Sequence, residues 1–126
     1  MTARATSVVV ADDSEDLRYL YRMQLDTAGG FDVVGEATDG PNALDVCREL
    51  QPDVLILDLW MPPHGVAPFI PKIREASPHT RVIVVSGSLD ATVRNDVLGL
   101  GAHQFVDKQD VAGALGLIVQ RSLQSA

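Results

Sequence analysis

The segment Pro52-Asp53-Val54-Leu55-Ile56-Leu57-Asp58-Leu59-Trp60-Met61-Pro62 decides the fold of this chain. Its apolar run, Val54 to Leu57, has the length of a buried strand and ends at a single acid, Asp58. A strand that is apolar on both faces is typical of a parallel sheet covered by helices on both sides. Such sheets bind ligands beyond the carboxyl ends of their strands. Asp58 is therefore predicted to lie at the mouth of an α/β sheet.

Other apolar runs of the chain also end in polar residues. These residues are Asp12 and Asp13 after Val8–Ala11, Ser86 after Val82–Val85, and Lys108 shortly after Phe105–Val106. The carboxyl ends of parallel strands meet at one edge of a sheet, so these side chains are expected to converge with Asp58. Three acids, one hydroxyl and one ammonium group thus predict a single site.

Short segments rich in Val, Ile and Leu alternate with helical patterns along the chain. We predict strands at Val8–Ala11, Asp32–Ala37, Val54–Leu57, Val82–Val85 and Gln104–Val106. Strands that alternate with helices imply right-handed crossovers and a doubly wound sheet. The predicted fold class is α/β, with one five-stranded parallel sheet and helices on both faces.

Apolar residues recur at helical spacing between the predicted strands. The stripes are Leu17, Leu20, Tyr21, Leu25 and Ala28; Ala43, Leu44, Cys47 and Leu50; and Leu89, Val93, Val97 and Leu100. The last helix is predicted from about Val111 to Leu123. Proline is tolerated in the first turn of a helix but not in its interior. We therefore predict a short third helix that starts near Pro68 and bends at Pro71.

The composition is typical of one domain with protein or small-anion partners. The chain has 126 residues, is 46% hydrophobic and carries a formal net charge of −7, which argues against direct nucleic-acid binding. No apolar run approaches the roughly 20 residues of a membrane span, and Met1–Ser7 has no apolar signal segment. A single cysteine, Cys47, is expected to be a core residue of a cytoplasmic protein.

The three acids predict a metal site. Asp12, Asp13 and Asp58 in one cleft would repel one another by roughly 4 kcal/mol per pair at about 4 Å and an effective dielectric constant of about 20. A cation relieves this repulsion, and carboxylates with room for water suit Mg²⁺. The alternative is that the acidic segment 13–16 only caps and starts a helix. The additional acid, Asp58, favours the metal.

Asp58 is also a candidate nucleophile. A carboxylate can accept a phosphoryl group as an acyl phosphate, and the transferred group needs cations and donors around its oxygens. Lys108 and Ser86 would supply an ammonium and a hydroxyl group. Singly, Lys108 could be a surface lysine and Ser86 a turn residue. Their joint placement at strand ends favours a role in the site.

Four segments carry a resemblance to the receiver domain of two-component response regulators, the phosphoacceptor domain found in chemotaxis regulators. They are Val8–Ser14, Pro52–Pro62, Val82–Ser88 and Gly101–Lys108. They follow the family's order and spacing and cover nearly the whole chain. The resemblance implies a flavodoxin-like (βα)5 domain over residues 1–126 with strand order 2-1-3-4-5, a short tail at residues 1–6 and no output domain.

The resemblance also implies a role for each site residue. Asp58 would accept the phosphoryl group, while Asp12, Asp13, Asp58 and the Trp60 backbone carbonyl would hold Mg²⁺ or Mn²⁺. Ser86 and Lys108 would bind the phosphoryl oxygens. Ser86 and the aromatic Phe105 would then form a switch that reshapes the face made by the fourth helix, fifth strand and fifth helix.

The partners implied by the resemblance are proteins of a phosphorelay. A sensor histidine kinase or a histidine phosphotransfer protein would donate the phosphoryl group, and a downstream protein or a linked output domain would respond. The chain would not be a turnover enzyme. Apolar residues beyond one sheet-facing stripe in the last helix, such as Leu117, leave open a weak homodimer through the switch face.

Three alternative functions compete with a phosphorylated receiver. A haloacid-dehalogenase-like phosphatase usually needs a second acid where Trp60 stands, and a flavodoxin-like cofactor binder needs a phosphate loop where Asp12 and Asp13 stand. A receiver-like scaffold without phosphorylation is the more serious alternative. It is suggested by Gly65-Val66, which occupy the place of the family's usual Asp-Gly, and by the unusual prolines Pro68 and Pro71.

Overall fold

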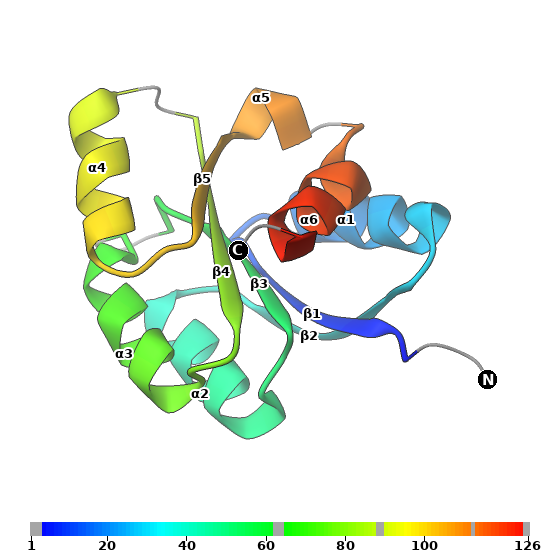
Figure 1. Ribbon diagram of the computed structural model, residues 1–126, viewed down its shortest axis with the longest axis horizontal. Helices are drawn as coiled ribbons and strands as arrows, with labels where there is room; N and C mark the ends of the chain where they lie inside the picture. The colour runs from blue at the N-terminus through cyan, green and yellow to red at the C-terminus, as the bar shows by residue number, and fades with distance from the viewer. Residues whose placement is uncertain (1–3, 62–64, 88–89, 112, 125–126) are drawn as a thin grey trace.

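The computed structural model describes residues 4–61, 65–87, 90–111 and 113–124 (Figure 1). A five-stranded parallel sheet has the order β2-β1-β3-β4-β5, which confirms the predicted fold class and strand order. The strands are β1 Thr6–Ala11, β2 Phe31–Ala37, β3 Val54–Asp58, β4 Arg81–Ser86 and β5 Gln104–Asp107. Each predicted strand lies within an observed one. Strand β1 begins at Thr6, the last residue of the predicted tail at residues 1–6.

Helices cover both faces of the sheet (Figure 1). They are α1 Glu15–Ala28, α2 Gly40–Leu50, α3 Ile70–Ala76, α4 Ala91–Gly99, α5 Lys108–Val111 and α6 Leu115–Gln124, with a 3-10 turn, η1, at Ala67–Phe69. The helices α2, α3 and α4 pack on one face, and α1, α5 and α6 pack on the other. The carboxyl edge of the sheet, where the parallel strands end, therefore lies between two helical layers.

The central strand β3 shows how the two layers are built. Leu55 and Leu57 face the layer of α2, α3 and α4, while Val54 and Ile56 face the layer of α1 and α6. All residues of β3 are buried, as the uninterrupted apolar run predicts. Cys47 lies in the first of these layers, where burial raises the pKa of its thiol to about 12. This agrees with its predicted role as a core residue.

The predicted last helix was wrong as one continuous element. The structure ends α5 at Val111 and begins α6 at Leu115. Gly113 has φ of 98°, a backbone conformation that breaks a helix and that glycine adopts without strain. Val111, Leu115 and Val119 nevertheless pack into the same layer. The apolar period therefore continued across a break that only the backbone of Gly113 reveals.

The third helix is short, as predicted, but it does not bend at Pro71. Pro68 lies in η1, and Pro71 lies in the first turn of α3, where a missing backbone donor leaves no hydrogen bond broken. The two prolines thus belong to two successive short elements. One residue of the predicted stripe in α4, Leu89, lies outside the described residues.

The start of α2 is in close contact with the Phe69 ring. A Cβ atom added to Gly40 would lie 2.5 Å from Phe69 Cδ2, so we expect Gly40→Ala to lower the free energy of unfolding by about 1–3 kcal/mol. Urea denaturation measures this loss. Gly99→Ala is the matched control, because a Cβ at Gly99 in α4 meets nothing within 4 Å. Equal stability of the two variants would show that the Phe69 ring moves aside without cost.

Candidate functional site

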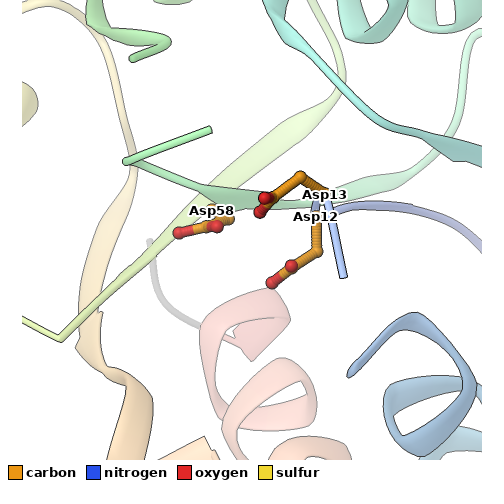
Figure 2. Close-up of side chains that lie close together, drawn as sticks. All are labelled: Asp12, Asp13 and Asp58. Atoms are coloured by element: carbon orange, nitrogen blue, oxygen red, sulfur yellow. The ribbon is translucent and has the colours of Figure 1, made fainter. Parts of the chain in front are cut away.

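Three carboxylates meet at the carboxyl edge of the sheet. Asp12 and Asp13 follow β1, and Asp58 is the last residue of β3. One oxygen of each lies within 4.8 Å of the other two, and the three side chains converge in Figure 2. Asp12 and Asp58 are only 1% and 6% exposed, whereas Asp13 is exposed. The structure thus brings together the three acids that the strand ends predicted.

Backbone hydrogen bonds orient the two buried carboxylates in the same way. The Ser14 amide donates to Asp12 Oδ1 at 2.9 Å, and the Trp60 amide donates to Asp58 Oδ1 at 3.3 Å. In each case the donor is two residues further along the chain, as in an Asx turn. The Oδ1 atom of each carboxylate is therefore held by a backbone amide of its own segment.

Lys108 lies next to the other carboxylate oxygens. Its Nζ atom is 3.5 Å from Asp12 Oδ2 and 3.6 Å from Asp58 Oδ2. Lys108 is the first residue of α5, directly after β5, which places its ammonium group at the same edge of the sheet. One positive charge therefore stands between two buried negative charges and leaves an excess of negative charge.

The acids fit an oxygen-ligated divalent cation. Asp12 Oδ2 is buried and accepts no hydrogen bond from the described residues, and carboxylate oxygens are the ligands that Mg²⁺ prefers. The alternative of a simple helix start explains less, because Ser14 already caps α1 by accepting from the Leu17 amide. An additional cation would offset the charge that Lys108 leaves uncompensated.

Burial and charge raise the pKa of Asp58 above its usual value. Desolvation is the larger cause and the charge of Asp12 is the second, while Lys108 opposes both. The folded protein therefore holds a proton on Asp58 more tightly than the unfolded chain does. Ionised Asp58 costs stability, and this cost is present above the folded-state pKa and disappears below the unfolded-state pKa of about 3.9.

We accordingly expect Asp58→Asn to be more stable than the native chain at pH 7 in the presence of a metal chelator, by an amount on the order of 1 kcal/mol. Asparagine keeps an acceptor for the Trp60 amide but carries no charge. The gain should shrink as the pH falls through the raised folded-state pKa of Asp58, and should be lost below the unfolded-state pKa of about 3.9. Urea denaturation across this pH range measures it. A gain that is independent of pH would contradict the electrostatic cause.

Ser86 and Phe105 lie on one face of the sheet. Ser86 ends β4 and is fully buried; by strand alternation it faces the same side as Val84. Phe105 pairs in register with Val84 and packs against the layer of α2, α3 and α4. Asp58 pairs with Val85, so Ser86 is one residue further along the neighbouring strand. Of the two residues predicted to form a switch, Phe105 therefore lies beside Val84, two residues before Ser86 and on the same face of the sheet.

Gly65 and Val66 are hydrogen-bonded to the backbone of residues that closely follow Asp58. Gly65 donates its amide to the Met61 carbonyl at 2.8 Å, and Val66 donates to the Leu59 carbonyl at 3.1 Å. Trp60 is exposed, and its ring lies beside Gly65. Pro62 of the matching motif lies outside the described residues. The Gly65-Val66 pair, in which the chain departs from the family pattern, is thus hydrogen-bonded to the backbone of Leu59 and Met61.

Sequence reasoning did not identify Arg18 as a residue of the site. Its Nη1 atom donates to the backbone carbonyl of Asp12 at 2.7 Å, and its Nε atom donates to Glu36 Oε1 at 2.8 Å. Although burial opposes the shift, hydrogen bonds from Arg22 and Arg18 lower the pKa of Glu36. The only signal in the sequence was an arginine next to Leu17 of the helical stripe, which looks like any exposed helix residue. Arg18 ties α1 to the end of β1.

The extra apolar residues of the last helix lie along α1. Leu117 is exposed and, with Leu20 and Met23, lines an apolar groove between α1 and α6. This groove is on the α1 side of α6. The homodimer through the predicted switch face stays a prediction.

Comparison with known proteins identifies the family. The family model for the response regulator receiver domain matches residues 8–119. The chain belongs to the response regulator receiver domain family. Domains of this family are signalling phosphoacceptors of two-component systems and bind Mg²⁺ through acidic residues. Family membership favours the receiver over the phosphatase and the flavodoxin-like cofactor binder.

Similar proteins include both single receivers and longer proteins. The chain is 30% identical to chemotaxis protein CheY of Thermotoga maritima over 80% of this chain and 83% of that protein. It is 38% identical to protein-glutamate methylesterase/protein-glutamine glutaminase 5 of Myxococcus xanthus, of which it covers only 29%. The receiver domain of the putative response regulator NarL from Mycobacterium tuberculosis superimposes with a TM-score of 0.90 at 29% identity, over 98% of this chain and 100% of that one. No helix in the described ranges has the length and apolar character needed to cross a membrane.

Proposed function

We propose that this receiver domain is phosphorylated on Asp58 by a sensor histidine kinase or a histidine phosphotransfer protein of a cytoplasmic phosphorelay. The observation that supports this most strongly is the arrangement of the Asp58 carboxylate. Its Oδ1 atom accepts the Trp60 amide, while its Oδ2 atom lies 3.6 Å from the Lys108 ammonium. One oxygen is thus fixed by the backbone and the other is next to a cation at the open edge of the sheet.

The proposed chemistry is a direct transfer between two nucleophiles. Asp58 Oδ2 forms a bond to phosphorus while the phosphorus–nitrogen bond of a phosphohistidine breaks. The electron pair of that bond stays on the histidine nitrogen, which takes a proton from solvent. The products are an acyl phosphate on Asp58 and a neutral histidine. Lys108, whose charge opposes the raised pKa of Asp58, favours the ionised carboxylate before transfer and contacts the phosphoryl oxygens afterwards.

The acids Asp12, Asp13 and Asp58, together with the Trp60 carbonyl oxygen, would hold Mg²⁺ or Mn²⁺. Such a cation supplies charge neutralisation for the phosphoryl oxygens when it is bound. Asp12 is kept in place for this role by two contacts, from the Ser14 amide to its carboxylate and from Arg18 to its carbonyl.

The proposed output is a change in the face that includes α4 and β5. The Ser86 hydroxyl would move to bind a phosphoryl oxygen, and Phe105, which lies on the same face of the sheet, would turn inward behind it. A local change of charge would thereby bias a two-state element. A downstream protein or a linked output domain would bind the altered face. Methylesterase and glutaminase activities belong to the longer relatives so named, and for this chain we propose no turnover reaction.

A second candidate function is a receiver-like scaffold that is not phosphorylated. The observation in its favour is that Gly65 and Val66, where the chain departs from the family's pattern, are hydrogen-bonded to Met61 and Leu59 close to Asp58. The test is intact-mass spectrometry of the native chain after incubation with acetyl phosphate. A gain of one phosphoryl group that requires Mg²⁺ supports the phosphoacceptor. If acetyl phosphate and a phosphorylated histidine donor both leave the mass unchanged, the scaffold is the better account.

Lys108→Ala should slow phosphorylation by acetyl phosphate by about tenfold to a hundredfold, because one charge-stabilising contact to the phosphoryl group is lost. The same change should strengthen Mg²⁺ binding, since the ammonium no longer competes for Asp12 Oδ2 and Asp58 Oδ2. The rate is read by mass spectrometry at saturating Mg²⁺, and the affinity by calorimetry. Lys72→Ala removes an exposed lysine on α3 as a control. Loss of rate and of Mg²⁺ affinity together would indicate that Lys108 only supports the local fold.

A further inference from the structure

Tyr21 is a buried tyrosine whose hydroxyl group finds no hydrogen-bond partner among the described residues. It lies in the middle of α1, is 2% exposed, and packs in the apolar layer that contains Val10 and Ile56. Its hydroxyl makes no hydrogen bond within the described part of the chain. A buried hydroxyl without a partner costs stability, and phenylalanine would fill the same space without that cost. The hydroxyl therefore requires an explanation.

Asp12 supplies the other unpaired atom. Among the buried side-chain nitrogen and oxygen atoms of the described residues, Asp12 Oδ2 and the Tyr21 hydroxyl are the two that lack a hydrogen bond. One is an acceptor and the other can donate. Lys108 contributes charge to Asp12 Oδ2 from 3.5 Å but makes no hydrogen bond to it.

The position of Tyr21 on α1 favours an approach of its hydroxyl to Asp12. Helix α1 begins just after Asp12, at the carboxyl edge of the sheet. Long side chains in a helix lean toward the start of that helix, so the Tyr21 ring is expected to lean back toward the edge where the acids lie. The pKa of Tyr21 is raised, first by burial, then by the charge of Asp12 and then by that of Asp58. The hydroxyl is thus within electrostatic reach of Asp12.

We propose that Tyr21 is a positioning residue for Asp12: its hydroxyl donates to Asp12 Oδ2, after a side-chain rotation or through one ordered water, and so orients this carboxylate toward the metal. Ser14 holds one carboxylate oxygen and Tyr21 then steadies the other. Groups that hydrogen-bond to metal ligands commonly set metal affinity. The hydrogen bond between Tyr21 and Asp12 does not depend on the proposed function. Its effect on Mg²⁺ affinity does rest on the proposed metal site.

The contact is tested first without metal. Urea denaturation in the presence of a chelator compares Tyr21→Phe in the native chain and in Asp12→Ala. We expect Tyr21→Phe to lower the urea midpoint when Asp12 is present, and to leave it unchanged or raise it in Asp12→Ala. Tyr19→Phe, which removes the hydroxyl of an exposed tyrosine on the same helix, should change neither. A rise of equal size for Tyr21→Phe in both backgrounds would overturn the proposal, since it would show a hydroxyl without a partner.

The positioning role is tested by Mg²⁺ titration. Trp60 is the only tryptophan and its amide donates to Asp58, so its fluorescence reports on the site. Tyr21→Phe should bind Mg²⁺ about tenfold more weakly than the native chain, and Tyr19→Phe should bind equally well. Unchanged affinity in Tyr21→Phe would refute the positioning role. If the native chain binds no Mg²⁺, the metal proposal fails, and the urea comparison decides the contact between Tyr21 and Asp12 by itself.

Discussion

Asp58→Asn is expected to gain no phosphoryl group from acetyl phosphate and Mg²⁺, whereas the native chain gains one. The amide oxygen of asparagine is a poor nucleophile, so the change removes the proposed reacting group while keeping the shape and the acceptor for the Trp60 amide. Intact-mass spectrometry measures the outcome directly. This is a complete loss, the largest effect that we expect of any substitution in the chain.

The matched control for that experiment is Asp32→Asn. Asp32 is an exposed acid on the edge strand β2, away from the carboxyl edge of the sheet, and its removal changes the net charge by the same amount. It should be phosphorylated like the native chain. Persistence of the adduct in Asp58→Asn would place the phosphoryl group on another side chain and would refute the proposed role of Asp58.

The second large effect is expected for Mg²⁺ binding by Asp12→Asn, which should weaken by about a hundredfold. Asp12 is the more deeply buried of the acids, and its Oδ2 atom has no hydrogen bond within the described ranges. Asparagine still accepts the Ser14 amide, so the backbone turn is preserved. What is lost is one negative charge at the metal, and hard cations depend strongly on the number of charged oxygen ligands. Calorimetric titration measures the change.

Asp16→Asn is the control for the metal experiment, because Asp16 is an exposed acid in the first turn of α1. Its Mg²⁺ affinity should match that of the native chain. Equal, small losses in Asp12→Asn and Asp16→Asn would mean that Mg²⁺ is attracted only by the general negative charge of this edge. When a chelator removes metal from both proteins, Asp12→Asn should be at least as stable as the native chain, because one buried negative charge beside Asp58 is removed.

The sequence was sufficient to predict the sheet and the position of the acids. Residues 54–58 form a strand that is buried on both sides, and such a strand leaves little choice of environment. The polar residue at its end must then lie at the edge of the sheet, and the same argument places Asp12 and Ser86. The apolar periodicity therefore predicted most of the fold, and the strand ends predicted where the polar residues of the site lie.

Contacts between elements could not be predicted in the same way. The hydrogen bond from Arg18 to the Asp12 carbonyl depends on how α1 packs against β1, and the hydroxyl of Tyr21 was hidden in an apolar stripe. The break between α5 and α6 rests on the backbone angle of Gly113, since the apolar period runs through it unchanged. The sequence gives the chemistry that each side chain can perform, but only the packing of α1 on the sheet shows which of these groups are in contact.

The measurement that tests the central claim most directly is the location of the phosphoryl group on the native chain. After incubation with acetyl phosphate and Mg²⁺, reduction with borohydride converts an aspartyl phosphate to homoserine, and peptide mass spectrometry identifies the residue that changed. We predict homoserine at position 58 only when both the phosphodonor and Mg²⁺ are present. Homoserine at position 12, 13 or elsewhere, with residue 58 intact, would contradict the assignment of Asp58 as the phosphoacceptor.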